Sequence, residues 1–142
     1  MLSALDFKRV YFFGIVLFGL IAYGIYLLLK VSPLEQTIVY KEKVNNLANL
    51  YVTEANAGAT TGFSYRFYLY DGSKSDEDFK RSLMDTASPF LITSDSKALD
   101  KIKNGVIYLN IKGRIYSFNN NPAYRYNDSI YKIPAVITAA PY

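Results

Sequence analysis

The sequence contains no cysteine, no histidine and no tryptophan among its 142 residues. Without a thiol the chain forms neither a disulfide framework nor a cysteine-ligated zinc site. Without imidazole it forms neither a histidine metal site nor a Ser-His or Cys-His nucleophilic centre. The sequence therefore indicates no catalytic residue, no cofactor and no metal ligand, and it gives no positive evidence for an enzyme.

The excess of positive charge is small. The chain has 16 basic and 12 acidic side chains, which gives a net charge of +4. Lys8, Arg9 and Lys30 less Asp6 contribute +2, and the 13 basic and 11 acidic side chains of residues 32–142 contribute the other +2. A nucleic-acid-binding domain needs a concentrated basic surface, so we expect no nucleic-acid partner.

One long hydrophobic run dominates the start of the chain. From Val10 to Leu29 there are 20 residues without a charge. At about 1.5 Å per residue a helix of this length spans roughly 30 Å, the thickness of the hydrocarbon core of a bilayer. We therefore expect a short cytoplasmic tail at 1–9 and a transmembrane anchor at 10–30 in contact with membrane lipid.

Two other interpretations of this run are weaker. A cleaved signal peptide has an apolar core of about 7–15 residues followed by a cleavage site between small residues. The Leu28-Leu29-Lys30-Val31 segment offers no such site. A buried core helix is the second alternative, but so long an uncharged run is unusual inside a small protein.

The orientation of the anchor is not decided by counting basic residues at its two ends. Two lie on the N-terminal side, and Lys30, Lys41 and Lys43 lie on the C-terminal side. The compact Lys8-Arg9 pair on a nine-residue tail is typical of a signal anchor, and a cysteine-free remainder suits an oxidising space. We expect a single-pass protein of the cell membrane, with its N-terminus inside and its C-terminal domain in the periplasm or outside the cell.

Residues 31–62 are predicted to form a helical linker region. Ser32, Pro33 and Glu35 fit a helix start with a capping box, and the helix could continue to about Ala55. The β-branched segment 37–40 keeps a strand as the alternative.

Residues 63–142 are predicted to form an α+β domain outside the membrane, with a mainly antiparallel sheet and its helices on one face. Including the helix in the linker, the chain after the anchor would contain two to three helices. Within the domain we expect helices at 75–86 and 94–103, and strands at 63–70, 89–93, 106–111, 114–118, 124–133 and 135–139. We also expect 106–111 and 114–118 to form a hairpin across Lys112-Gly113.

Two polar segments invite a chemical interpretation. The acidic segment 71–78 resembles a calcium loop, but Gly72 is second where the EF-hand needs glycine sixth, and Ser75 with the acids after it fits a capped helix. Ser94, Ser96 and Lys97 could form a Ser-Lys pair, but serines at a predicted helix start are ordinary caps. The structural interpretation is the better one in both cases.

Tyrosine is the most informative residue type, with 14 copies. In a strand over 63–70, Tyr68 and Tyr70 would point to the face opposite Phe67 and Leu69, where solvent or a partner could meet them. Tyrosine and arginine are typical of protein interfaces, although tyrosine is also simply a good strand former. We take Tyr68, Tyr70, Tyr124, Arg125 and Tyr126 as candidate partner-binding residues.

These observations favour a single-pass envelope protein whose α+β domain binds another protein. Such a domain could act in immunity to a toxin, in exclusion of a phage or plasmid, or as an accessory of an envelope complex. A membrane-anchored domain that binds or senses a small molecule is one alternative, and an enzyme that uses carboxylates or a Ser-Lys pair is another. The sequence leaves self-association open.

Overall fold

The computed structural model describes residues 4–30, 34–56 and 62–140. The chain divides into two compact units, Met1–Pro33 and Leu34–Tyr142.

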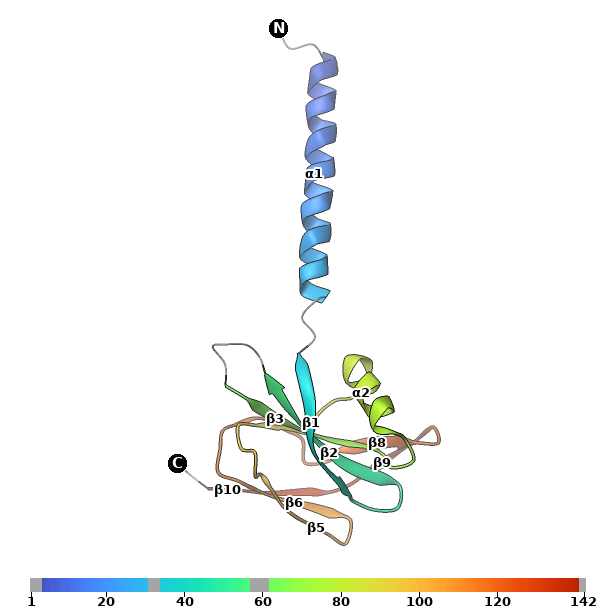
Figure 1. The fold of residues 1–142 in the computed structure, drawn as a ribbon, viewed down its shortest axis with the longest axis vertical. Helices are drawn as coiled ribbons and strands as arrows, with labels where there is room; N and C mark the ends of the chain where they lie inside the picture. Colours follow the sequence, from blue (N-terminus) through green and yellow to red (C-terminus); the bar gives the residue numbers. More distant parts are fainter. Residues whose placement is uncertain (1–3, 31–33, 57–61, 141–142) are drawn as a thin grey trace. The chain divides into compact units, whose positions relative to one another are not determined.

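The first unit contains one long helix, α1 (Ala4–Lys30), drawn in blue in Figure 1. The segment Arg9–Leu27 is long and apolar enough to cross a membrane. The large side chains described along it are exposed. The predicted helix is therefore confirmed.

In the second unit, residues 34–56 and 62–140 form three sheets and one short helix, α2 (Asp76–Asp85). The largest sheet has five strands, antiparallel throughout, in the order β1 (Glu35–Lys43), β2 (Ala48–Asn56), β3 (Ser64–Asp71), β4 (Leu91–Thr93) and β7 (Ile115–Phe118). The second sheet has the order β10 (Ala135–Ala139), β6 (Val106–Ile111) and β5 (Leu99–Lys103), with β10 parallel to β6. The third is the hairpin of β8 (Ala123–Tyr126) and β9 (Ser129–Lys132). The predicted α+β class with a mainly antiparallel sheet is confirmed.

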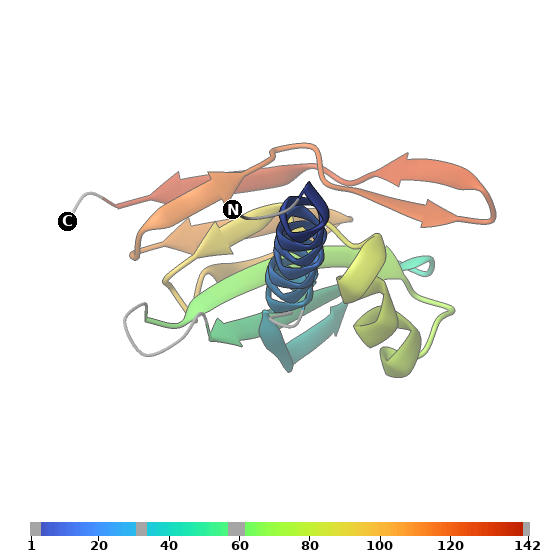
Figure 2. The same cartoon turned by 90° about the horizontal axis from the view of Figure 1, so that it is seen from above.

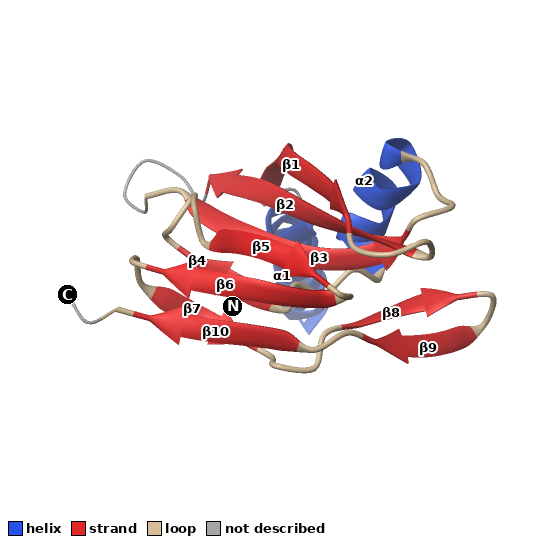
Figure 3. Cartoon of the chain, turned by 90° about the horizontal axis from the view of Figure 1, so that it is seen from below, coloured by secondary structure: helices blue, strands red, loops and turns tan. Residues whose placement is uncertain are grey.

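The main core lies between the five-stranded and the three-stranded sheets, which stack as two layers (Figures 2 and 3). Alternate residues of a strand point to opposite faces. On one face of β2 and β3, the buried side chains are Leu50, Val52, Phe67 and Leu69. They belong to the same core as Ile107, Leu109 and Ile111 of β6.

A second, smaller core lies on the opposite face of β2 and β3. There Phe79 of α2 is fully buried and stacks on Tyr51, with ring centroids 4.0 Å apart. The Tyr68 and Tyr70 rings meet the same phenylalanine edge-on, at 5.5 and 5.3 Å. This helix therefore covers the face on which the sequence suggested that Tyr68 would be displayed.

The predicted helix from residue 33 to about 55 is wrong, because this segment forms the β1–β2 hairpin. The Asn45 side chain closes the turn by accepting hydrogen bonds from the backbone N–H groups of Leu47 and Ala48, both at 2.8 Å. The strand alternative for 37–40 is the correct one. Residues 34–56 thus belong to the folded domain rather than to a helical linker.

The predicted helix at 94–103 is also wrong. The Ser94 hydroxyl accepts a hydrogen bond from the Arg114 N–H, and Asp95 accepts from the N–H groups of Lys97 and Lys112, so these residues form a turn. The strand β5 follows. Asn104 and Gly105, with φ of 55° and 72°, form the tight turn that joins β5 to β6.

The predicted hairpin of 106–111 with 114–118 is also wrong. The strand β6 pairs with β5 and β10, whereas β7 pairs with β4 in the other sheet. The helix predicted at 75–86 and the strands predicted at 63–70, 106–111 and 135–139 are confirmed to within two residues. The run predicted at 124–133 turns back at Asn127 and Asp128, whose φ values are positive, to give β8 and β9.

Replacing Phe79 should strongly destabilise the domain, because its fully buried ring packs on Tyr51 and Tyr68 at the centre of this small core. We expect Phe79→Ala to lower the free energy of unfolding by about 3–5 kcal/mol. Denaturant unfolding of the full chain in detergent measures this. The matched control is Met84→Ala on the same helix, where the side chain is 78% exposed and a change within about 0.5 kcal/mol is expected. Equal effects would contradict this account of the core.

Candidate functional site

A cleft of about 760 Å³ lies where α2 and the end of β3 face the β8–β9 hairpin. We call it the hairpin cleft. One wall comes from the end of β3, the turn after it and the residues that follow α2. The other comes from β8 and its turn. The helix and the hairpin lie at the same end of the domain in Figure 3. The residues that carry charged or aromatic groups into it are Tyr70, Asp71, Lys74, Tyr124, Arg125 and Asp128.

Three of the five candidate residues predicted from the sequence line this cleft: Tyr70, Tyr124 and Arg125. They come from strands that are far apart in the sequence, since β3 and β8 contact one another across the domain. The sequence indicated each segment but gave no reason to place them together.

Burial separates the five candidates. Tyr68 is 2% exposed, and its hydroxyl donates to the Gln36 side-chain oxygen at 2.8 Å. Tyr124 is 6% exposed and stacks on Tyr131, with ring centroids 5.6 Å apart. The expectation that these two rings are displayed to a partner is therefore corrected, because both are packed inside the domain. Arg125 is exposed, and Tyr70 and Tyr126 are half-buried.

The hairpin presents a second set of side chains that the sequence analysis missed. On β9, Ile130 is 66% exposed and Tyr131 is also exposed. Ile130 pairs directly with Arg125 across the strands, so both side chains stand on the same face, opposite the buried Tyr124. In the sequence, the Asn127-Asp128 pair is the signal that could have predicted this hairpin, because a two-residue turn there sets which residues of the two strands pair.

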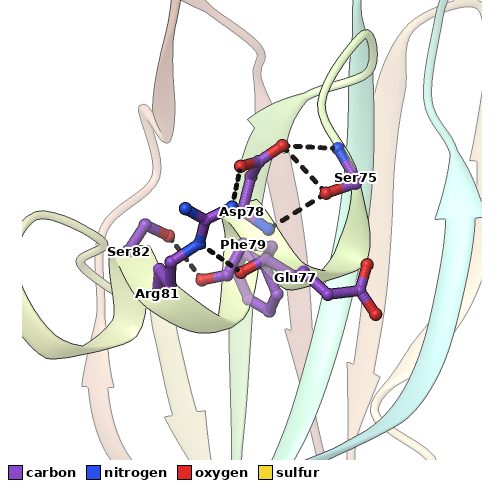
Figure 4. Close-up of polar contacts among 6 residues, drawn as sticks. All are labelled: Ser75, Glu77, Asp78, Phe79, Arg81 and Ser82. Carbon is purple, nitrogen blue, oxygen red and sulfur yellow. Dashed lines mark hydrogen bonds and ion pairs between the residues drawn. The ribbon is translucent and has the colours of Figure 1, made fainter.

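The helix α2, which precedes the cleft-lining residues Thr86 and Ala87, is fixed at its first turn (Figure 4). The Ser75 hydroxyl accepts from the Asp78 N–H at 3.1 Å, and the Asp78 carboxylate accepts from the Ser75 N–H at 3.2 Å. Arg81 binds the other carboxylate oxygen at 2.7 Å. The hydrogen bonds from Ser75 lower the pKa of the Asp78 carboxyl. This reciprocal pair is the capping box, so the capped-helix interpretation of segment 71–78 is confirmed.

A second contact ties α2 to the sheet. One Asp76 carboxylate oxygen accepts from Lys41 of β1 at 2.6 Å and from the Tyr51 hydroxyl of β2 at 2.8 Å. The hydrogen bonds from Lys41 and Tyr51 lower the pKa of the Asp76 carboxyl, and the bond to Asp76 raises the pKa of Lys41. Burial raises the pKa of the Tyr51 hydroxyl. Helix and sheet are thus joined by one carboxylate.

The hairpin cleft is polar. Asp71 is buried and its carboxylate accepts from the Ser73 N–H at 2.8 Å and from the Ser73 hydroxyl at 2.6 Å, which closes the turn after β3. Lys74 and Arg125 form no ion pair with a described residue. Two cations, Lys74 and Arg125, and two carboxylates, Asp71 and Asp128, therefore line the cleft, an arrangement suited to charged or hydrogen-bonding groups of a partner.

Another cleft, of about 850 Å³, opens between the two stacked sheets beside β1 and β5. We call it the inter-sheet cleft. Its apolar floor includes Val52, Phe67 and Leu99, and Glu42, Glu54 and Lys97 are among its charged residues. The Tyr65 hydroxyl donates to Glu54 at 2.9 Å, which holds that carboxylate beside the opening.

The described residues contain no group of three or more acidic side chains placed to hold a metal ion. Ser94, considered for a Ser-Lys pair, uses its hydroxyl to hold Arg114 in the turn before β7. Ser96 and Lys97 line the inter-sheet cleft.

Comparisons of this chain with protein-family models, with curated proteins and with solved structures find no match.

Acidification should weaken the domain through Asp76. Because its pKa is lower in the folded chain, the carboxylate stabilises the fold above its unfolded pKa of about 3.9, and this contribution is lost as the pH falls through the folded value. We expect Asp76→Asn to be less stable than the wild type at pH 7 and to lose less stability between about pH 6 and about pH 3. Thermal unfolding across this range measures both. Parallel pH curves for Asp76→Asn, the control Asp100→Asn and the wild type would contradict the assignment.

Proposed function

We propose that this protein is a membrane-attached binding module: α1 anchors it in the cell membrane, and the domain binds another protein through the β8–β9 hairpin and the hairpin cleft. The observation that carries the proposal is the exposed pair Arg125 and Ile130, side by side on the hairpin. Arginine is one of the residue types enriched in binding hot spots, and here it stands next to an exposed apolar side chain on the same face of the hairpin.

The hairpin is suited to this role because its inner side is fixed while its outer side is free. Tyr124 packs in the main core, and Tyr126 and Tyr131 meet edge-on at 6.4 Å. A rigid support lowers the entropy lost when the exposed side chains are immobilised by a partner. The adjoining cleft gives a partner's protruding side chain a place to enter, with Lys74 and Arg125 as its cations.

Membrane attachment gives the module its location. A segment of this length and composition spans the hydrocarbon core as a helix, and the Lys8-Arg9 pair favours a cytoplasmic N-terminus. The domain then lies outside the membrane, in the periplasm or outside the cell. An immunity, exclusion or envelope-complex role is compatible with this location.

The inter-sheet cleft favours one second candidate function, the binding of a small molecule. Its volume and its apolar floor with charged residues beside it are those of a ligand site. The hairpin remains the better-supported site, because an exposed arginine and an exposed apolar side chain stand together there on one face of a hairpin whose other face is packed.

Binding should depend on the hairpin. We expect the full-length, C-terminally tagged chain to recover one discrete second protein from crosslinked membranes of its own cells. Arg125→Glu/Ile130→Ser should lose that protein, since loss of hot-spot contacts weakens binding by about thirtyfold or more. The control Lys103→Glu/Met84→Ser makes the same changes of charge and polarity at exposed positions elsewhere. Recovery of the tagged chain alone, or equal recovery by both variants, would contradict the proposal.

Membrane attachment should depend on α1. After alkaline washing we expect the intact chain in the membrane pellet, and a reporter fused to its C-terminus should be active only outside the cytoplasm. Leu17→Arg/Ile21→Asp should release the chain, because each charge costs about 2.5–3.5 kcal/mol near the centre of a spanning helix. Leu17→Val/Ile21→Val is the control that should stay in the pellet. Release of the wild type, or a mature chain without α1, would show that the helix is no anchor.

A further inference from the structure

The inter-sheet cleft contains two glutamates on opposite sides of an apolar row. In the register of the sheet, Tyr40 of β1 lies beside Val52 of β2, and Val52 lies beside Phe67 of β3. Glu42 follows two residues after Tyr40, and Glu54 follows two residues after Val52, so both glutamates share the face of this row. Because β1 and β2 run antiparallel, the two glutamates lie on opposite sides of the row. All five residues line the cleft.

Each of these carboxylates is held by a tyrosine hydroxyl and keeps one oxygen for another donor. The Tyr40 hydroxyl donates to Oε2 of Glu42 at 2.6 Å, and the Tyr65 hydroxyl donates to Oε2 of Glu54 at 2.9 Å. These hydrogen bonds raise the pKa of both tyrosine hydroxyls, which therefore stay protonated donors at neutral pH. Within 4–30, 34–56 and 62–140, no lysine or arginine forms an ion pair with either glutamate. The second oxygen of each carboxylate is thus available to a ligand.

The other charged residues leave the cleft with an excess of negative charge. The Lys101 ammonium lies 3.5 Å from the Asp100 carboxylate and 5.5 Å from the centre of the Tyr108 ring, so the pair of Lys101 and Asp100 contributes no net charge. Lys97 is the other basic side chain among the described residues that line the cleft, and it is exposed. The two glutamates are therefore opposed by one lysine. Charge complementarity favours a cation over an anion as the ligand.

The uncharged surface of the cleft suits the apolar part of such a ligand. The volume of about 850 Å³ is within the roughly 300–1,000 Å³ of small-molecule sites. Val52, Phe67 and Leu99 form an apolar floor that a ring or a hydrocarbon chain can cover. The Tyr40 side chain is 45% exposed, and the face of a tyrosine ring attracts an ammonium group. The cleft therefore offers a surface to each part of an amine with an apolar body.

We propose that the inter-sheet cleft binds a small organic cation, an amine whose ammonium group is bound by Glu42 or Glu54 and whose apolar body lies on Val52 and Phe67. This inference rests on the second candidate function, the binding of a small molecule in this cleft, and names the chemical class of the ligand. It needs no contact from the β8–β9 hairpin, so a protein bound there and an amine bound here are separate claims.

The absence of tryptophan makes a direct test available, because the fluorescence of an indole ligand can be excited selectively in the presence of this chain. Tryptamine, tryptophol and indolepropionate share one ring and a short chain, and they end in an ammonium, a hydroxyl and a carboxylate group. The full-length chain in uncharged detergent is titrated into each ligand, with protein-free detergent as the background. We expect tryptamine to bind about tenfold more tightly than tryptophol, because a hydrogen bond between charged groups is the stronger one. Indolepropionate should bind most weakly.

A charge-removing variant tests whether the two glutamates cause this preference. Glu42→Gln/Glu54→Gln keeps an oxygen that can accept from each tyrosine, and its unfolding temperature checks that the fold is retained. We expect its affinity for tryptamine to fall about tenfold, to that of tryptophol, while its affinity for tryptophol stays unchanged. The control Glu35→Gln/Glu77→Gln makes the same change of charge at exposed positions outside the cleft and should bind tryptamine like the wild type.

The outcomes separate this inference from the functions on which it builds. Equal affinity of the wild type for all three ligands, or equal loss of tryptamine binding in both double variants, would overturn the amine as the ligand and leave small-molecule binding in place. Absence of saturable binding by all three ligands would contradict the second candidate function as well. Arg125→Glu/Ile130→Ser should bind tryptamine like the wild type, whether or not the hairpin binds another protein.

Discussion

The structure of the domain depends on the burial of β2 and β3 on both faces. Alternation along these strands sends aliphatic side chains and Phe67 into the core between the sheets, and Tyr51 and Tyr68 toward α2. Both cores are therefore built on the same two strands. The three-stranded sheet packs on one face of these strands, and α2, which leads into the residues that line the hairpin cleft, packs on the other.

Polar contacts beside the second core fix where α2 lies on the sheet. A stacked ring alone would allow α2 to slide on the sheet, but the Asp76 carboxylate holds Lys41 and Tyr51 at hydrogen-bonding distance. The capping box at Ser75 fixes the start of the helix, and the Ser73 contacts of Asp71 fix the turn before it. The hairpin on the opposite wall is fixed by Tyr124. The exposed Arg125 and Ile130 therefore project from a rigid scaffold.

The sequence predicts those elements whose formation depends on neighbouring residues alone. The predictions of the capped helix after Ser75 and of the aromatic strand β3 are confirmed, because capping and side-chain alternation depend on residues that are close together in the sequence. The segment at 34–56 was misread because its helix start signal competed with β-branched residues, and pairing between β1 and β2 decided the outcome. The predicted helix at 94–103 is followed directly by Asn104-Gly105, which is a strong hairpin signal and joins β5 to β6 in the structure. The site could be predicted only in part, because burial of Tyr68 and Tyr124 depends on tertiary contacts.

The central claim is that the hairpin is a covered surface in the cell. Hydrogen exchange of the full chain tests it most directly, in native membranes and after purification in detergent. The account predicts slower exchange in β8, β9 and their turn in native membranes, with unchanged exchange in β2 and β3, whose amides are buried in both conditions. Equal exchange of the hairpin in both conditions would contradict a partner at this surface.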